Sequence, residues 1–227
     1  MRIRWYGQSA FLIDGDGRSV FIDPFGAMEG LAARGMQFDY PAINGVSADL
    51  LLVTHEHADH SGVEVILGSP QVIRSTAGTF ESPLGEVVGI ASEHDDAAGT
   101  SRGPNTIFCF TYDGLRLCHF GDFGQAVLRT EQRRAIGEVD VLFLPVGDGP
   151  TVGGARAAAT VRELRPRLVL PMHYRTDAVN FLEPPDAFLD ALGGRVEKLA
   201  ESELIAEQLL GTADEPTVAL PAAPIAS

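Results

Sequence analysis

Short apolar runs separated by polar turn residues dominate the first part of the chain. Leu50–Val53 is apolar at every position, which is typical of a strand buried on both faces. Ala10–Ile13 and Ser19–Ile22 flank the turn cluster Asp14-Gly15-Asp16-Gly17, and this arrangement predicts a hairpin. Further strands are expected at Ile3–Tyr6, Gln71–Arg74, Glu86–Ala91 and Leu168–Leu170.

Longer segments with helical patterning are fewer. The expected helices are Met28–Arg34, Ser61–Leu67, Thr130–Ile136, Gly154–Leu164 and Asp186–Leu192. Residues 24–47 are rich in glycine and proline and predict a long loop, a kind of connection that is often functional. Residues 196–210 fit strand or helix equally well. After Thr212 the Pro- and Ala-rich tail is expected to be extended or loosely ordered.

The order of elements repeats along the chain. A first hairpin ends near Asp23, and a second, Thr106–His119, turns at Asp113-Gly114 and ends near Asp122. Ala48–Val53 then resembles Val139–Leu144. The repeat predicts two similar halves whose sheets pack together in one domain spanning 1–227.

Composition narrows the class of protein. With 227 residues, 45% of them apolar, the chain can bury one sizeable core. A formal net charge of −14 disfavours nucleic-acid and membrane partners, so a small-molecule substrate is expected. No signal peptide or membrane-spanning stretch is recognised, which predicts a cytoplasmic protein. The sequence leaves a homo-oligomer open.

Two cysteines flank the Asp113-Gly114 turn. Counting outward from the turn pairs Cys109 with Cys118 across the two strands. We expect two reduced, buried thiols side by side, because a cytosolic core keeps thiols reduced.

The densest polar feature is Thr54-His55-Glu56-His57-Ala58-Asp59-His60, directly after the buried strand. Open α/β sheets place their sites just beyond such strand ends. Imidazole and carboxylate together suit Zn, Mn or Fe. Four ligand-type residues within seven exceed what one catalytic ion usually takes, so two ions completed from elsewhere fit better. The candidates for the missing ligands follow other strands: His94, His119, Asp122 and His173.

The run resembles the His-x-His-x-Asp-His signature of the metallo-β-lactamase superfamily. Four other motifs of that family have counterparts in the same order: Phe21–Phe25, His94, Gly121-Asp122 and Pro171–Tyr174. The most similar branch contains the ascorbate-6-phosphate lactonase-like proteins and N-acyl-phosphatidylethanolamine phospholipase D. The resemblance implies an α/β fold, an αββα sandwich of two packed mixed sheets with helices on the outer faces.

The same resemblance implies a role for each residue. It assigns His55, His57 and His94 to one metal ion, and Asp59, His60 and His173 to a second. Asp122 would bridge the two ions. Asp23 would stand behind the ligands and hold the His-rich loop. His119 has no ligand role in the family, and we expect it to be a donor behind the ligands or a buried polar group.

The expected activity is that of a metal-dependent hydrolase. Two divalent ions, zinc first and manganese or iron as alternatives, would supply hydroxide for attack on an ester, lactone or phosphodiester. Asp59 is the candidate to orient the nucleophile or move a proton, whereas Glu56 is expected to point away. One alternative is a non-catalytic metal-binding or sensor protein on the same fold. A nuclease is a third, weaker alternative.

Substrate contacts are the least determined part of the site. Arg102, Tyr174 and Arg175 lie near predicted ligands in the sequence, and the two arginines would suit an anionic substrate group. Structural ion pairs are the alternative for both arginines. Gln8 occupies the position where many relatives carry histidine, which would change the polarity of the pocket.

Overall fold

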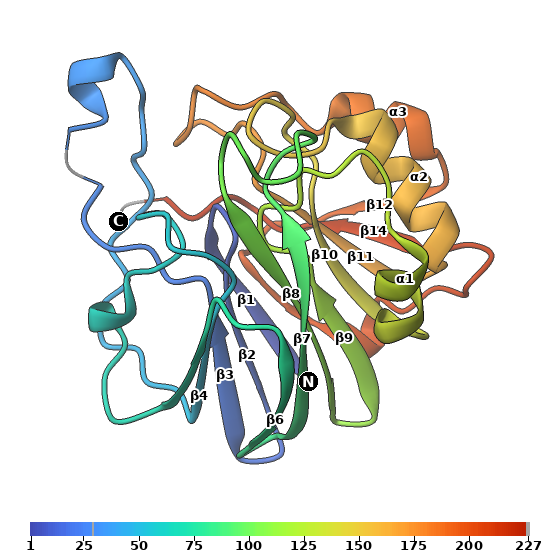
Figure 1. Cartoon of the computed structure of the whole chain (residues 1–227), viewed down its shortest axis with the longest axis horizontal. Coiled ribbons are helices and arrows are strands. Elements are labelled where there is room, and N and C mark those ends of the chain that lie inside the picture. Colours follow the sequence, from blue (N-terminus) through green and yellow to red (C-terminus); the bar gives the residue numbers. More distant parts are fainter. Residues whose placement is uncertain (29, 226–227) are drawn as a thin grey trace.

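Two packed β-sheets form the body of the molecule in this computed structural model, which describes residues 1–28 and 30–225 (Figure 1). The smaller sheet contains, in spatial order, β13 (Glu203–Ile205), β1 (Arg2–Gly7), β2 (Ala10–Gly15), β3 (Arg18–Ile22), β4 (Leu50–Val53) and β5 (Gln71–Arg74). The larger sheet contains, in spatial order, β12 (Arg195–Lys198), β14 (Thr217–Leu220), β11 (Leu168–Met172), β10 (Val141–Pro145), β9 (Leu115–His119), β8 (Pro104–Tyr112), β7 (Gly85–Glu93) and β6 (Gly78–Ser82).

Three α-helices lie beside the larger sheet, as Figure 1 shows. They are α1 (Thr130–Ile136), α2 (Gly154–Leu164) and α3 (Asp186–Leu192), and all three coincide with predicted helices. The outer face of the smaller sheet is covered mainly by the long loop 24–47. There Phe25, Tyr40 and Ile43 pack with Phe21 and Leu51 in a second, smaller core. The described part of the chain contains no helix with the length and apolar character needed to cross a bilayer.

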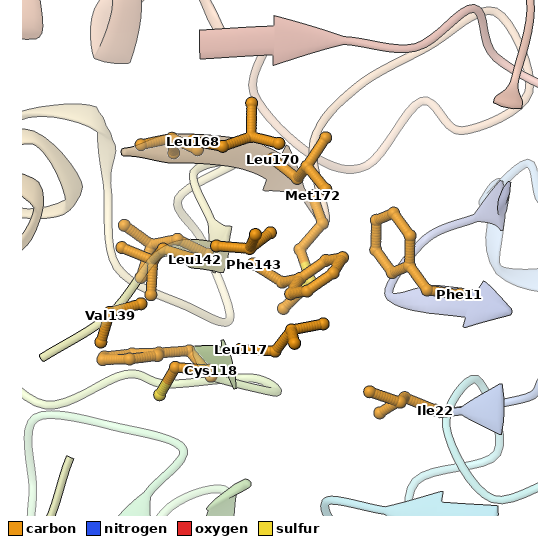
Figure 2. Close-up of a cluster of buried hydrophobic side chains, with 14 of the residues drawn as sticks. Phe11, Ile22, Leu117, Cys118, Val139, Leu142, Phe143, Leu168, Leu170 and Met172 are labelled. Atoms are coloured by element: carbon orange, nitrogen blue, oxygen red, sulfur yellow. The ribbon is translucent and has the colours of Figure 1, made fainter. Parts of the chain in front are cut away.

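The main core lies between the two sheets. Figure 2 shows Phe11 and Ile22 from the smaller sheet facing Phe143, Met172 and Leu117 from the larger one. The rings of Phe11 and Phe143 meet edge to face with their centroids 4.8 Å apart. Burying each such side chain stabilises the fold by roughly 1.5–3 kcal/mol, so the contact between the sheets fixes where their strand ends meet.

The predicted duplication is visible in the strand order. The sequence β1-β2-β3-β4-β5 of the smaller sheet corresponds to β7-β8-β9-β10-β11 of the larger one. In each half an antiparallel hairpin is followed by a parallel strand, β4 beside β3 and β10 beside β9. The two packed mixed sheets confirm the α/β sandwich expected from the sequence.

Two predicted helices were wrong. Ser61–Leu67 contains only a 3-10 turn at Val63–Val65. The chain there is pressed against the preceding loop, because a Cβ on Gly62 would lie 2.3 Å from the backbone nitrogen of Gly26. Met28–Arg34 contains only the 3-10 turn Ala32–Arg34, which ends at Gly35 with φ 71°; residue 29 of that prediction lies outside the described residues.

The C-terminal tail is also more ordered than its composition indicated. Strand β14 inserts between β11 and β12 and is buried at all four positions. The ambiguous segment 196–210 holds β12 from its start, then β13 and the 3-10 turn Ala206–Gln208. Edge strand β6 was missed, because its residues are largely exposed and carry little apolar pattern.

The cysteine prediction holds in its geometry. Cys109 stands opposite Cys118 in the β8–β9 hairpin, and both are free, buried thiols with their Sγ atoms 2.7 Å apart. Burial raises the pKa of the Cys118 thiol well above its ordinary value, which keeps it protonated and unreactive.

Candidate metal centre

Four strands end at one edge of the sandwich, and the predicted ligands follow them. The His-rich run begins after β4, His94 follows β7, Asp122 lies three residues beyond β9, and His173 follows β11. The structure thus brings all seven predicted ligands together from both halves of the chain. Their donor atoms form three overlapping triads, each within 4.8 Å: His55, His57 and His94; His55, His60 and Asp122; Asp59, His60 and His173.

Asp122 lies at the middle of this cluster. Its Oδ2 is 3.1 Å from Nε2 of His94 and 3.2 Å from Nε2 of His173. Its Oδ1 is 3.2 Å from Nε2 of His60. One carboxylate therefore faces imidazoles of the first and third triads with its two oxygens.

Hydrogen bonds behind the rings turn their inner nitrogens toward the centre. Nδ1 of His60 donates to Asp23 at 2.8 Å, and Nδ1 of His94 donates to the carbonyl of Pro150 at 2.9 Å. Nδ1 of His55 lies 3.1 Å from the hydroxyl of Thr54, which itself donates to Asp23 at 2.7 Å and so accepts from the ring. Each Nε2 therefore faces inward, and in the neutral ring it carries a lone pair.

The inward nitrogens fit a cation. Nδ1 of His57 lies 3.1 Å from Nε2 of both His55 and His94. The hydrogen bonds behind His55 and His94 make these two Nε2 atoms acceptors. His60 Nε2 and Asp122 Oδ1 are buried without a hydrogen-bond partner in the described chain. Acceptors held this close repel one another unless a positive charge lies between them, and neutral imidazole with carboxylate is the donor set of divalent zinc, manganese and iron.

Electrostatics support the same assignment. Burial, reinforced by the neighbouring His60, lowers the pKa of His55 to about 2. Burial opposes the charge on Asp122, yet His173 and His60 hold its pKa well below the usual range. Burial also opposes a charged His60, but Asp122, Asp59 and Asp23 raise its pKa well above the usual value. The cluster therefore holds ionised carboxylates whose field favours a positive charge.

Comparisons with known proteins identify the family of this chain. A model of the β-lactamase superfamily domain matches residues 2–173. The chain belongs to the metallo-β-lactamase superfamily. A UPF0173 metal-dependent hydrolase of Methylobacterium nodulans is 31% identical, over 86% of this chain and 93% of its own. A UPF0173 metal-dependent hydrolase of Thermococcus kodakarensis is 28% identical, over 87% of this chain and 94% of its own.

A solved structure from Thermotoga maritima, described as a zinc-dependent hydrolase of the metallo-β-lactamase superfamily, has the same fold. It superposes with a TM-score of 0.75 at 28% identity and covers 96% of this chain and 97% of its own. The present chain is thus a metal-dependent hydrolase of this superfamily. The narrower branch named from the sequence stays a prediction, since the relatives carry only the general description.

Three residues at the centre of this metallo-β-lactamase domain have a strained backbone conformation. Gln8, Asp23 and His173 have φ angles of 50°, 50° and 52°, where residues other than glycine are uncommon. Gly121 has φ 54°, and a Cβ there would lie 2.4 Å from Oδ1 of Asn105. Such strain typically persists where the surroundings fix a functional geometry.

Sequence reasoning missed Asn105 and the role of Thr54. Asn105 accepts the backbone N–H of Asp122 at 3.0 Å and donates to the carbonyl of Phe120 at 2.8 Å, so it holds the loop that presents Asp122. It is the second residue of strand β8, between Pro104 and Thr106, where the local sequence gives no signal of this role. Thr54 joins Asp23 to His55 and was overlooked within the His-rich run itself.

The residues expected behind the ligands lie as follows. Asp23 accepts from Thr54 and His60, which matches its expected place. His119 is buried, and its Nε2 donates to the carbonyl of Ser9 at 3.1 Å while its Nδ1 accepts from Gly121 N–H at 3.2 Å. It thus supports the loop before Asp122 and touches no ligand side chain. Glu56 points away and pairs with Arg74.

Of the predicted substrate contacts, only Arg102 faces open space beside the ligands. It borders a cavity of about 120 Å³ that His55 and His57 also line, and a larger pocket of about 670 Å³ between the His94 loop and the start of α2. Tyr174 instead stacks on Trp5 at 5.5 Å and is buried. Arg175 donates to the carbonyl of Leu182 at 2.5 Å and lies 3.6 Å from Glu183. For Tyr174 and Arg175 the structure favours packing and an ion pair over substrate binding.

Proposed function

We propose that the chain binds two divalent ions at this centre and hydrolyses ester, lactone or phosphodiester bonds in small anionic molecules. His55, His57 and His94 would hold one ion, and Asp59, His60 and His173 the other, with Asp122 between them. The observation that carries the proposal is the position of Asp122, whose two oxygens face imidazoles of both sets at 3.1–3.2 Å.

The donor set favours zinc, with manganese or iron as alternatives. It contains imidazole and carboxylate and no thiolate, since both cysteines lie elsewhere in the core. When bound, such ions would lower the pKa of a metal-bound water from near 16 to about 7, which would supply hydroxide at neutral pH.

The chain's own residues would place the substrate and manage the proton. Asp59 has 18% of its side chain exposed, compared with 3% for Asp122, so it is the acid of the centre that substrate and water can reach. Its Oδ2 is held by Gln8 at 2.9 Å. Asp59 is therefore suited to orient the attacking water and to accept its proton.

Arg102 supports the anionic character of the substrate. It borders both pockets beside the centre, and its guanidinium makes no ion pair or hydrogen bond with any described residue. Arg156 in the same larger pocket lies 3.4 Å from Asp96 and is thus partly neutralised. A free guanidinium beside a metal centre is suited to bind a carboxylate or phosphate with two hydrogen bonds.

The experiment that tests the proposal combines metal analysis with a substrate panel. Purified protein should carry two equivalents of metal and should turn over lactones, carboxylic esters or phosphodiesters, with the highest kcat/KM for anionic members. Asp122→Ala should lose both metal and turnover. Protein with full metal and no turnover on the whole panel would contradict the proposed reaction.

A further inference from the structure

The imidazoles of the centre differ in what stands behind them. His55, His60 and His94 each donate their outer N–H to an oxygen, those of Thr54, Asp23 and Pro150 respectively. His173 does not: its Nδ1 is buried without a hydrogen-bond partner among residues 1–28 and 30–225. Metal-ligating histidines almost always donate this second N–H to an acceptor, which fixes the tautomer and the ring orientation. His173 therefore calls for an acceptor that lies close by.

The side chain of Gln8 has an acceptor that is likewise buried without a hydrogen-bond partner in the described structure. It is fully buried in the turn between β1 and β2, and its Oε1 is buried without a partner in the described structure. The backbones of the two residues are already joined, because the N–H of His173 donates to the carbonyl of Gln8 at 3.2 Å. The two unpartnered atoms thus belong to residues in direct contact.

The other end of the Gln8 amide touches a second proposed ligand. Its Nε2 donates to Oδ2 of Asp59 at 2.9 Å. The reverse orientation of the amide would place Oε1 against an ionised carboxylate, so the hydrogen-bond network assigns nitrogen to this side. With Nε2 on Asp59, Oε1 remains free for a donor.

The turn that carries Gln8 is held firmly despite its strain. Gln8 has φ 50°, a left-handed conformation in which residues other than glycine are strained. Its carbonyl also accepts the indole N–H of Trp5 at 3.0 Å, and Trp5 stacks on Tyr174, the neighbour of His173. Two contacts therefore hold the turn against the His173 segment: the backbone hydrogen bond from His173 and the stacking of Trp5 on Tyr174.

We propose that Gln8 is a positioning residue for the second metal ion: its side-chain Nε2 donates to Asp59, and its side-chain Oε1 is the acceptor that Nδ1–H of His173 would take when the ion is bound. This inference deepens the proposed two-ion function and rests on it. A carboxamide suits the task because it donates and accepts at once in one rigid plane and does not ionise. Gln8 makes no described hydrogen bond to His55, His57 or His94, so its effect should be confined to the second ion.

The test uses two substitutions that separate the ends of the amide. Gln8→Glu keeps an acceptor for His173 and removes the donor to Asp59; Gln8→Leu removes both. Ser9→Ala is the matched control, because Ser9 lies in the same turn, is fully buried and has an unpartnered hydroxyl. Stepwise Zn²⁺ and Co²⁺ affinities are measured on the full chain against a competing chelator, and kcat and KM on any substrate found.

We expect both Gln8 variants to weaken one of the two ions by about 10–100-fold and to leave the other unchanged, as for other residues behind metal ligands. The visible spectrum of the Co²⁺ protein should change at one site only, and kcat should fall more than KM. In proton NMR of the zinc protein, the Nδ1–H signal of His173 should persist in Gln8→Glu and vanish in Gln8→Leu. Ser9→Ala should behave as wild type.

Wild-type affinities for both ions in Gln8→Leu would overturn the proposal. So would equal losses in Gln8→Leu and Ser9→Ala, because these would reflect disturbance of the turn alone. Wild-type protein that binds a single ion would overturn the two-ion function and this proposal with it. The two failures are thus distinguished by the behaviour of the wild type.

Discussion

At the scale of single residues, Gly121 shows how closely the loop before Asp122 is packed. A Cβ at this position would lie 2.4 Å from Oδ1 of Asn105 and 2.6 Å from Oγ1 of Thr54, both of which hold the centre together. Its φ of 54° adds strain for any other residue. The glycine therefore permits the contact between the two halves that places Asp122.

Gly121→Ala should lower the free energy of unfolding by about 2–5 kcal/mol, combining positive φ with overpacking. It should also reduce metal binding, because Asp122 follows directly. Gly114→Ala is the control: that glycine has φ 74° and no described atom within 4 Å of its added Cβ. Chemical denaturation measures the free energy of unfolding of both variants. Equal losses in the two variants would show that the close contact at Gly121 has no effect.

Arg102 carries the prediction on substrate charge. Arg102→Ala should raise KM for an anionic substrate roughly 10-fold or more, since a hydrogen bond to a charged group is worth about 1.5–3 kcal/mol. KM for a neutral analogue should not change. Arg175→Ala serves as the control, because its guanidinium is bound to Leu182 and Glu183. An unchanged KM for anions in Arg102→Ala would remove the argument for an anionic substrate.

Much of the site was readable residue by residue, but only where spacing along the chain carries the signal. The His-rich run predicts four candidate ligands, and His94, Asp122 and His173 follow strands, so topology alone brings these residues to one edge. Asn105 and the amide of Gln8 act through contacts between residues distant in sequence, such as Gln8 with Asp59, 51 positions apart. No local pattern encodes such pairs, and for the same reason the sequence could not reveal that Tyr174 stacks on Trp5 or that Arg175 binds Leu182 and Glu183.

At the scale of elements, the strands and longer helices follow from apolar pattern and turn residues, and the errors have a common cause. Ser61–Leu67 has a helical pattern, but close contact with the loop at Gly26 leaves room for only one 3-10 turn. The sequence did not predict a strand in the tail, because its alanine and proline content is typical of loosely ordered segments. Its strand β14 is stabilised by neighbours on both sides, β11 and β12, which local composition does not reveal.

The tail is therefore expected to be essential for folding. Removal of residues 217–227 deletes β14, which separates β12 from the larger sheet and uncovers one edge of the buried strand β11. Val218 and Leu220 alone contribute roughly 1.5–3 kcal/mol each, a large part of the ~5–15 kcal/mol typical of whole domains. The truncated chain should lose its cooperative thermal transition by circular dichroism. Removal of residues 223–227 is the control, and a cooperative transition in both would contradict the role of β14.

At the scale of the whole molecule, the centre joins the two halves, so metal binding should stabilise the entire fold. His55 and His60 come from the first half, and His94, Asp122 and His173 from the second. An ion present at about 100 times its Kd adds ~2.7 kcal/mol, equivalent to a Tm shift of roughly 5–10 °C in a chain of this size. Chelation should lower Tm by this amount, and added zinc should restore it.

Asp122→Ala provides the control for that measurement. Because it removes the residue between the two sets of ligands, chelator should change its Tm much less than that of the wild type. A wild-type Tm that does not respond to chelator or to added zinc would show that the centre does not couple metal to folding.

The central claim is that both halves build one site for two ions around Asp122. A crystal structure of the zinc-loaded protein, with anomalous difference maps collected on both sides of the zinc edge, tests it directly. We predict two peaks about 3.5–4 Å apart, one among His55, His57 and His94 and the other among Asp59, His60 and His173, with Asp122 touching both. A single peak, or peaks away from Asp122, would contradict the account.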